Sequence, residues 1–197
     1  MTLLASALER AARDLRELKT SFALVGGLAV SVRCEPRFTR DLDLAVAVST
    51  DHEAEQLVHA LVRRGYRLLA QIEQDAAKRL ATVRLRPPGP EGDGGVVLDL
   101  LFASSGLERE IVAAAQSLEV FAGQVVPVAT IPHLIATKVL ARDDRSRPQD
   151  LVDLRQMIGS LSPADVPHVH QALARIRALG FDRGRDLEQA FRELLSA

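Results

Sequence analysis

The spacing of apolar residues changes several times in the N-terminal part of the chain, and each change marks a new element. Leucines recur at helical spacing between residues 3 and 18, which predicts an amphipathic helix with an apolar side made of Leu4, Leu8, Leu15 and Leu18. The apolar run at 22–25 predicts a short strand that ends in a tight turn at Gly26-Gly27. A short helix is expected over 28–34, because Pro36 prevents its continuation.

Residues 41–48 alternate strictly between two kinds of position. Leucine or valine occupies every second position, whereas Asp41 and Asp43 fall on the opposite face together with two alanines. A period of two is typical of a strand with one buried face. This stretch therefore predicts a strand that carries two carboxylates on the same face.

Further elements follow in mixed order up to residue 128. A helix is expected to begin with Thr50 or Asp51 as its cap and to stop at Gly65. Two strands, at 81–86 and 96–102, enclose the segment PPGPEGDGG and predict a hairpin with an exposed loop. The remaining elements of this part are a helix and two short strands, at 105–116, 119–121 and 124–128.

The pattern changes to helices alone after residue 128. Pro132 in a first turn after Thr130, and Pro148 after the polar segment RDDRSRPQ, mark two helix starts. Four helices are expected, at 130–142, 148–158, 162–180 and 185–195. The sequence thus predicts an α/β lobe with a mixed sheet over residues 1–128 and a helical C-terminal lobe over residues 129–197.

Composition limits the classes of protein that fit this pattern. Of 197 residues, 47% are hydrophobic and 26% are charged, which provides both a core and a polar surface. No apolar run is long enough for a transmembrane helix, and the single cysteine, Cys34, fits a reducing compartment, so we expect a cytoplasmic protein. A net charge of −1 and an aromatic content of 4% give no argument for nucleic-acid binding and argue against base stacking as the main recognition device.

The candidate chemistry lies between residues 22 and 46. Asp41 and Asp43 are two residues apart on a predicted strand, so their carboxylates share a face, about 6.6 Å apart along the strand. Two carboxylates aimed at one point repel each other unless a cation lies between them. Such oxygen ligands suit Mg²⁺ or Mn²⁺ bound with substrate phosphates. The alternative is an Asp-Leu-Asp that forms only the solvent face of a strand.

Two more features of this segment point to a phosphate. Gly26-Gly27 lies between a strand and a helix, where glycine lets backbone N–H groups approach an anion and the helix start adds positive partial charge. Arg33, Arg37 and Arg40 flank the site, and each is able to neutralise a triphosphate. Taken singly these features are a turn and surface arginines. Their order, with 13 residues between Gly-Gly and Asp-Leu-Asp, favours a phosphate site.

The segment FALVGGLAVSVRCEPRFTRDLDLAV resembles the signature of the DNA polymerase β-type nucleotidyltransferase superfamily, in which a Gly-Gly or Gly-Ser pair and a short helix precede Asp-x-Asp. Within that superfamily it is similar to the AbiEii-type nucleotidyltransferase toxins of bacterial abortive-infection systems, through Arg37, Thr39, Asp41 and Asp43. The similarity extends from about residue 20 to about residue 160. It implies a polymerase β-like nucleotidyltransferase lobe followed by a helical lobe.

The resemblance also assigns roles to later residues. The superfamily has a third carboxylate on a later strand, which matches Asp99, the one polar residue of VVLDLLF; an alternative is an Asp bonded to backbone N–H groups. A lysine and an acidic residue on the following helices match Lys138 and Asp150, with Asp153 beside the latter. Lys138 also falls on an apolar helical stripe, where a solvated lysine is out of place. Lys138 and Asp150 are alternatively a purely structural ion pair, or Lys138 reaches solvent from the edge of the stripe.

Function follows from the resemblance as an expectation. It implies a metal-dependent enzyme that transfers a nucleotide from a nucleoside triphosphate to an acceptor, with Asp41, Asp43 and Asp99 as metal ligands. The residues expected at the nucleotide are Gly26, Gly27, Arg37, Thr39, Arg40 and Lys138, and Asp150 is expected to act with Lys138. It also implies a toxin of a toxin–antitoxin system, with an RNA acceptor such as the 3′ end of a tRNA and an antitoxin protein as partner.

Three arginines near the start of the helical part, Arg142, Arg145 and Arg147, are able to bind the backbone of an RNA acceptor. Asp143 and Asp144 offset much of their charge, so the segment is alternatively only a solvated loop.

Two other functions stay open besides the RNA-modifying toxin. A small-molecule transferase, such as an aminoglycoside- or lincosamide-modifying enzyme, shares the same motif. A non-catalytic nucleotidyltransferase fold that only binds RNA or a protein is the third reading, which the presence of all three carboxylates disfavours.

Overall fold

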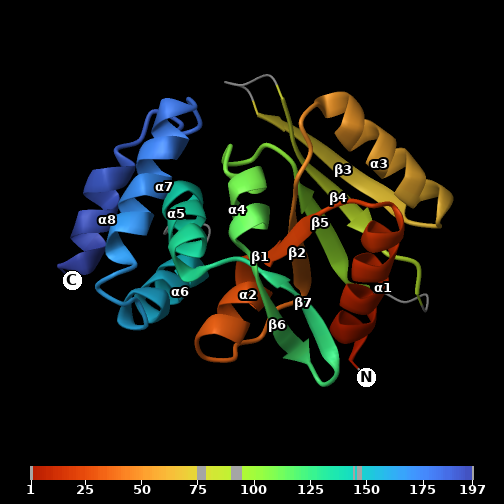
Figure 1. Cartoon of the computed structure of the whole chain (residues 1–197), viewed down its shortest axis with the longest axis horizontal. Coiled ribbons are helices and arrows are strands. Elements are labelled where there is room, and N and C mark those ends of the chain that lie inside the picture. The colour runs from red at the N-terminus through yellow and green to blue at the C-terminus, as the bar shows by residue number, and fades with distance from the viewer. Residues whose placement is uncertain (1, 75–78, 90–94, 144, 146–147, 197) are drawn as a thin grey trace.

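The computed structural model describes the chain apart from residues 1, 75–78, 90–94, 144, 146–147 and 197 (Figure 1). Within these residues it forms one seven-stranded sheet, surrounded by helices. The strands are β1 (Phe22–Val25), β2 (Asp41–Val46), β3 (Arg67–Gln74), β4 (Arg79–Arg86), β5 (Val97–Leu101), β6 (Gln116–Phe121) and β7 (Gln124–Val128). The helices are α1 (Leu3–Glu17), α2 (Gly26–Arg33), α3 (Asp51–Arg63), α4 (Glu108–Ala114), α5 (Ile131–Ala141), α6 (Pro148–Gly159), α7 (Val166–Ala178) and α8 (Leu187–Leu195).

The sheet is mixed, and its order is β3-β4-β5-β2-β1-β7-β6. The central strand β2 pairs antiparallel with β1 and parallel with β5. Beyond β5 the sheet continues antiparallel through β4 and β3. On the other side β7 joins β1 in parallel, and β6 closes the edge antiparallel to β7. This order brings β1, β2 and β5, which carry the candidate site, next to one another.

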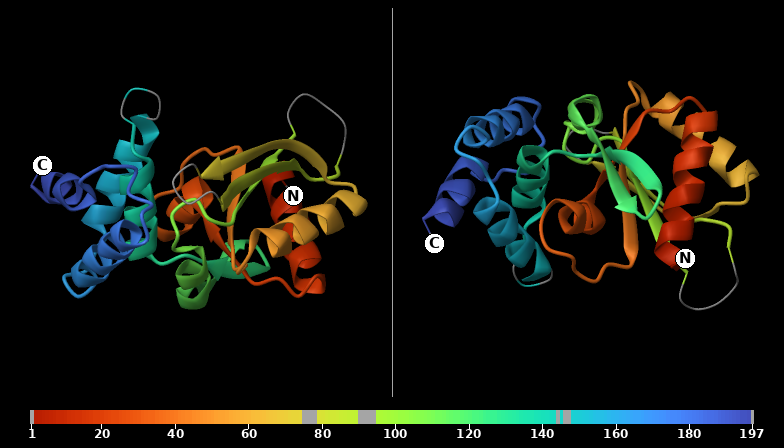
Figure 2. Two further views of the ribbon diagram at one scale, coloured as in Figure 1. Left: turned by 90° about the horizontal axis from the view of Figure 1, so that it is seen from above. Right: turned by 60° about the horizontal axis from the view of Figure 1, so that its bottom comes forward.

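The two faces of the sheet have different surroundings. Helices α1, α3 and α4 lie on the same face (Figure 2), and the core fills the space between them and the strands. Leu42 and Leu44 of β2 and Leu98 of β5 are fully buried in this core. Because side chains alternate along a strand, the residues between these leucines point to the opposite face.

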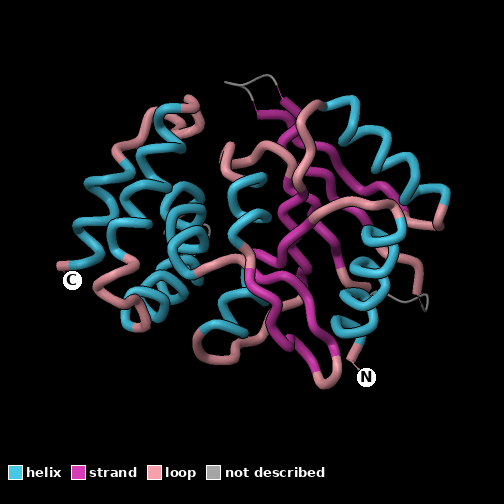
Figure 3. The backbone as a smooth tube through the Cα atoms, viewed as in Figure 1, coloured by secondary structure: helices cyan, strands magenta, loops and turns pink. Residues whose placement is uncertain are grey.

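The C-terminal helices form a separate group beside the sheet (Figures 1 and 3). Helix α5 lies at the centre of the group and contacts α6, α7 and α8 as well as α2. Leu173, Ile176 and Phe191 are fully buried in this group and belong to the same hydrophobic cluster as the core of the sheet. None of the helices in the described part of the chain combines the length and the apolar character needed to cross a bilayer.

The mixed α/β fold confirms the predicted fold class, and the differences in detail have identifiable causes. The apolar pattern missed β3, because this edge strand exposes Leu68 and Ile72 instead of burying one face. Gly26 does not form a separate turn but is the first residue of α2. The helix expected at 105–116 begins only at Glu108, whose side chain accepts hydrogen bonds from the preceding serine backbone.

The hairpin between β4 and β5 is present, with antiparallel pairing. Its expected exposed loop cannot be compared in full, since residues 90–94 lie outside the described part of the chain. The expected helix at 162–180 begins at Val166, and the other C-terminal helices match their predicted ranges closely.

Asp14 fastens α1 to the connection between α3 and β3, and its removal should destabilise the fold. Its nearly buried carboxylate accepts hydrogen bonds from the Tyr66 hydroxyl at 2.8 Å and from Arg64 at 2.9 Å. Burial raises the pKa of Tyr66, so the hydroxyl stays protonated and requires an acceptor. We expect Asp14→Ala to lower the free energy of unfolding in urea by about 2–3 kcal/mol. Glu17→Ala, which removes the exposed partner of Arg64, should cost less than about 1 kcal/mol, and equal losses would contradict this account.

Candidate active site

An open cleft of about 1170 Å³ lies between the uncovered face of the sheet and the C-terminal helices. The strands β2, β4 and β5 supply one wall, and α5 and the beginning of α6 supply the other. The loop that joins α2 to β2 and the glycines at the start of α2 also border the cleft. Residues that are distant in the sequence therefore meet at this one surface.

Three carboxylates share the sheet face that borders the cleft. The parallel register of β2 and β5 places Asp43 directly beside Asp99, and Asp41 lies two residues before Asp43 on the same face. Their exposure differs: Asp41 is exposed, Asp43 is half-buried and Asp99 is buried. The structure thus brings together the three aspartates that the sequence predicted as metal ligands.

Arg84 of β4 neutralises the innermost of these carboxylates. It faces Asp99 across the antiparallel pair, with its Nε donating to Oδ1 at 2.8 Å and its Nη2 donating to Oδ2 at 2.7 Å. These hydrogen bonds, and the negative charges of Asp41 and Asp43, raise the pKa of Arg84 above its usual value. Within the described residues, no three Asp, Glu, His or Cys side chains form a metal-binding group as they stand. Asp99 is instead engaged by an arginine that the sequence analysis did not single out.

Gly26 creates the space that Asp43 occupies. Its φ of 66° lies in the left-handed region, which favours glycine. A β-carbon at this position would lie 1.9 Å from Oδ2 of Asp43, so any other residue would displace the carboxylate. Asp43 therefore lies against the first turn of α2, whose N-terminus has no side-chain cap hydrogen bond within the described structure. The positive end of this helix is favourable for a negative group.

The loop between α2 and β2 is fastened to the C-terminal helices by Arg37. The Arg37 Nη2 donates to Oδ2 of Asp153 at 2.8 Å, and Nε lies 2.7 Å from Oδ1 of the same carboxylate. A β-carbon on Gly27 would lie 2.4 Å from Nη2, so the guanidinium passes directly over this glycine. Arg37 was expected to contact the nucleotide, but in the structure its guanidinium is paired with Asp153 of the protein itself.

The rest of this loop borders the cleft with less internal contact. Arg40 is exposed and its guanidinium carbon lies 5.3 Å from the centre of the Phe38 ring. Thr39 donates a long hydrogen bond of 3.4 Å to the carbonyl of Asp41. Arg40 is therefore the arginine of this loop that remains placed to reach a ligand.

Lys138 of α5 connects two acidic residues of α6. Its Nζ lies 2.6 Å from Oδ1 of Asp150 and 2.8 Å from Oδ2 of Asp153, and all three side chains are buried. Burial tends to raise the pKa of Asp153, but Lys138 and Arg37 outweigh it and hold that pKa below its ordinary value. Lys138 and Asp150 thus meet as expected, and Asp153 is the carboxylate that joins them to the loop.

Some basic residues predicted near the site are placed elsewhere. Arg33 does not border the cleft, because its guanidinium donates to the carbonyls of Val128 and Ala129. Burial lowers the pKa of Arg33. Arg142 and Arg145 follow α5 beside the cleft rather than inside it, and Arg147 and Asp144 lie outside the described residues.

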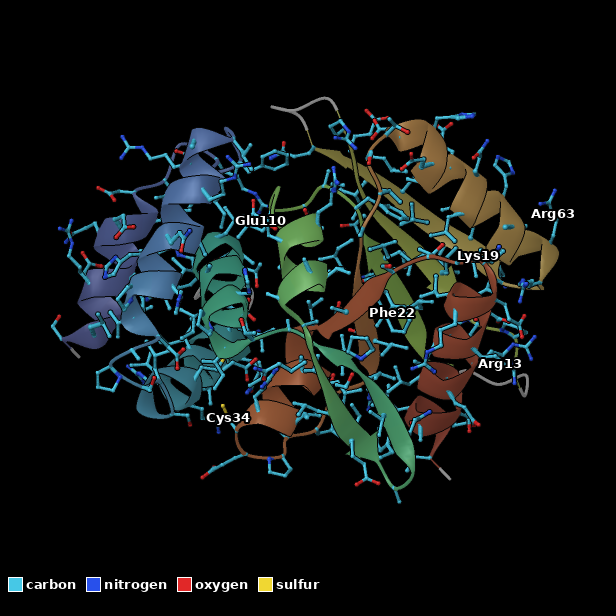
Figure 4. The ribbon with its side chains drawn as sticks, viewed as in Figure 1. Arg13, Lys19, Phe22, Cys34, Arg63 and Glu110 are labelled. Carbon is cyan, nitrogen blue, oxygen red and sulfur yellow. The ribbon has the colours of Figure 1, made fainter. Side chains whose placement is uncertain are left out.

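Cys34 lies at the end of α2 (Figure 4) and is not among the residues that line the cleft. It is partly buried and packs against the core. The chemistry-bearing residues that sequence reasoning missed are therefore Arg84 and the link through Asp153. Alternation in RLATVRLR separates Arg84 from its apolar neighbours, but only the strand register shows that it faces Asp99.

Solved structures with a similar architecture include an antibiotic-resistance factor and an antibiotic adenylyltransferase. The solution structure of the antibiotic-resistance factor ANT(2″)-Ia is 19% identical, with a TM-score of 0.57 over 95% of this chain and 96% of that chain. The crystal structure of ANT(2″)-Ia in complex with adenylyl-2″-tobramycin is 17% identical, with a TM-score of 0.51 over 89% and 95%. The lincomycin-bound lincosamide antibiotic adenylyltransferase LnuA is 14% identical, with a TM-score of 0.50 over 77% and 94%. The protein thus has the polymerase β-like nucleotidyltransferase fold.

The sequence also places the chain within a family. Residues 7–196 match the family model described as nucleotidyl transferase AbiEii toxin, type IV toxin–antitoxin system. The match spans nearly the whole chain, so the protein belongs to the AbiEii nucleotidyltransferase family. This confirms the predicted resemblance and extends it to α1 and to the last helices. No protein with a curated function matches the sequence.

The buried carboxylate of Asp153 should make a pH-dependent contribution to stability. Its pKa in the folded protein is below the ordinary 3.8, so its contribution is fully present above about pH 4 and is lost as the pH falls through the folded value. Asp153→Asn leaves Arg37 and Lys138 short of a buried counter-charge and should cost about 3 kcal/mol at pH 7 in urea unfolding. The difference from the wild type should shrink below about pH 4.

The matched control is Glu110→Gln, which removes an exposed ion pair with Arg175 (Figure 4). This change should cost less than about 1 kcal/mol at every pH. A difference between Asp153→Asn and the wild type that stays constant down to pH 2.5, roughly a unit below the ordinary carboxyl pKa, would show that the charge of Asp153 is not what stabilises this junction.

Proposed function

We propose that the protein transfers a nucleoside monophosphate from a nucleoside triphosphate to an acceptor, with the help of a divalent metal. The observation that carries this proposal is the grouping of Asp41, Asp43 and Asp99 on one sheet face beside Gly26, inside the cleft. Such a group of carboxylates has no role in packing the core. Membership of the AbiEii family supports the same chemistry.

The donor set fits Mg²⁺ or Mn²⁺. Asp41 and Asp43 present hard oxygen ligands on an open wall, and the absent side chain of Gly26 leaves room at the Asp43 carboxylate. Asp99 would be the third ligand if its pairing with Arg84 gave way to the ion. A divalent ion bound here neutralises the triphosphate and lowers the pKa of the acceptor hydroxyl.

The residues around the carboxylates have separate tasks in this proposal. The backbone N–H groups at the start of α2, where Gly26 and Gly27 allow close approach, bind phosphate oxygens together with Arg40. Thr39 and Arg37 hold the loop that carries Arg40, since Arg37 is paired with Asp153. From the other wall, Lys138 faces the cleft while Asp150 and Asp153 fix its position.

The reaction is an in-line displacement at the α-phosphorus. The acceptor hydroxyl oxygen forms the new bond, the bond to the bridging oxygen breaks and pyrophosphate leaves. The hydroxyl proton passes to Asp99, which accepts it once Arg84 has turned away. Positioning and charge neutralisation do most of the catalytic work in such transfers.

We further propose that the acceptor is RNA, such as the 3′ end of a tRNA, and that the protein is the toxin of a cytoplasmic toxin–antitoxin pair. The family description, which names a toxin of a type IV toxin–antitoxin system, supports the toxin part of this proposal. The cleft is open, with a volume of about 1170 Å³, and Arg142 and Arg145 follow α5, which forms one of its walls. An antitoxin protein is the partner that such a toxin requires.

A small-molecule acceptor is the second candidate. LnuA is named as a lincosamide antibiotic adenylyltransferase, and ANT(2″)-Ia has been solved with adenylyl-2″-tobramycin. Both share the fold over nearly their whole length. The same carboxylates and the same cleft would serve a hydroxyl of an antibiotic as well as a ribose hydroxyl.

The acceptor is tested by incubating the protein with each labelled triphosphate, Mg²⁺ or Mn²⁺, and either total RNA or an aminoglycoside and a lincosamide. We expect label on RNA, with an affinity that falls with salt at a slope near −0.7 per phosphate neutralised. Asp41→Asn and Asp43→Asn should reduce transfer at least about 100-fold, since even indirect metal-site partners cost about 10–100-fold. Exposed Asp165→Asn is the control and should be fully active. Label on the antibiotics alone would replace the RNA proposal by the second candidate.

The proposed competition between Arg84 and the metal ion for Asp99 is tested by measuring metal binding rather than turnover. Arg84→Met removes the cation paired with Asp99 but keeps a side chain of similar length, so Mn²⁺ binding measured by electron paramagnetic resonance should tighten severalfold. Arg40→Met removes a positive charge adjacent to Asp41 without touching Asp99 and controls for general electrostatics. An equal effect of both substitutions, or weaker binding by Arg84→Met, would exclude Asp99 as a metal ligand.

A further inference from the structure

Phe38 is exposed in a chain that otherwise hides its aromatic rings. Its exposure of 78% is the highest of any large hydrophobic residue described. Among the other described aromatic residues, one is partly buried, Phe121, and the rest are buried, namely Phe22, Tyr66, Phe102, Phe181 and Phe191. Phe38 borders the cleft, three residues before Asp41. An exposed ring at the active cleft forgoes about 1.5–3 kcal/mol of burial, which points to a ligand that covers it.

The backbone that carries the ring is held in place. Arg37 Nη1 donates to the carbonyl of Phe38 at 3.1 Å, and the same guanidinium is paired with buried Asp153. The backbone N–H of Arg37 also donates to the Ser31 hydroxyl at 3.3 Å. Phe38 therefore borders the cleft from a part of the loop whose backbone is already fixed. A ligand that packs on the ring loses little binding free energy to ordering of this loop.

The charge around the ring selects the kind of ligand. The Arg40 guanidinium lies 5.3 Å from the ring centre, within the range of a cation–π contact, and Arg84 also borders the cleft. An aromatic face beside arginines is the combination that binds nucleic-acid bases, because the ring stacks on the base and the cations neutralise the adjoining phosphates. A purely apolar ligand would make no use of the Arg40 charge, whereas Arg84 already has Asp99 as its counter-charge.

We propose that Phe38, supported by Arg40, is a stacking site for a nucleobase. This inference rests on the proposed function, because the base belongs either to the nucleoside triphosphate or to the RNA acceptor. Both sources present the same flat ring with a phosphate attached. The low aromatic content argued against base stacking as the main recognition device, but the tertiary structure places the ring of Phe38 at the edge of the cleft.

The chain contains no tryptophan, so a single introduced tryptophan serves as a fluorescent probe of its own surroundings. Phe38→Trp is the sole tryptophan of the chain, and its fluorescence should be quenched when a base stacks on it. We would titrate it with each of the four nucleoside triphosphates in Mg²⁺ and, separately, with a single-stranded RNA oligonucleotide. Quenching by triphosphates alone assigns the site to the donor base, quenching by RNA alone assigns it to the acceptor, and quenching by both assigns it to either base. Val125→Trp, at an exposed position of β7 outside the cleft, is the control and should not respond.

A second set of variants separates stacking from charge. Phe38→Ala should weaken binding of the quenching ligand between about 5-fold and about 150-fold, the range that stacking of one base provides. Inorganic tripolyphosphate, which has no base, should bind the wild type and Phe38→Ala equally. Phe38→Leu should resemble Phe38→Ala, and both should melt like the wild type because the ring packs on little.

The inference is overturned if neither triphosphates nor RNA quench Phe38→Trp, or if Phe38→Ala binds both as tightly as the wild type. Loss of tripolyphosphate binding in Phe38→Ala would likewise reject a base-specific role. These measurements need no turnover. Quenching without any nucleotide transfer would leave the stacking site standing and would reject the proposed function instead.

Discussion

Mutual repulsion of carboxylates on one sheet face is the constraint around which this molecule is arranged. The register of β2 and β5 sets Asp43 beside Asp99, with Asp41 on the same face. Arg84 neutralises Asp99 from the next strand, and Gly26 gives Asp43 a place at the positive end of α2. The leucines at alternate positions lock this register, because a slip of one residue would turn the carboxylates into the core.

A second group of charges joins the two walls of the cleft. Asp153 of α6 is fully buried and forms ion pairs with Arg37 of the loop between α2 and β2 and with Lys138 of α5. Removing one member of such a group costs more than the group contributes, since it leaves a buried charge without a partner. The C-terminal helices are thereby fixed as the second wall of the site, and the loop before β2 inherits its position from them.

Family membership supports the proposed transfer chemistry more closely than it supports any one acceptor. Structures with the same architecture include proteins solved with lincomycin and with adenylyl-tobramycin, at identities of 14% and 17%. In the proposed reaction the carboxylates and the glycines at the start of α2 act on the triphosphate, whichever acceptor is used. Under this proposal the acceptor is chosen by the surfaces around them, which include the loop with Phe38 and Arg40 and the rim that follows α5.

The sequence by itself determined the elements and the candidate ligands, because strand alternation at 41–46 and helical spacing are local properties of the chain. It also determined the family, since Gly-Gly and Asp-Leu-Asp stand close together in one segment. The sequence did not predict edge strand β3, because this strand buries neither face and therefore lacks an alternating apolar pattern. Only the tertiary structure decided that Arg84 engages Asp99, that Arg33 faces carbonyls and that Arg37 is bound by Asp153. These contacts join residues far apart in the chain, and their partners are set by strand register and helix packing, which no local pattern contains.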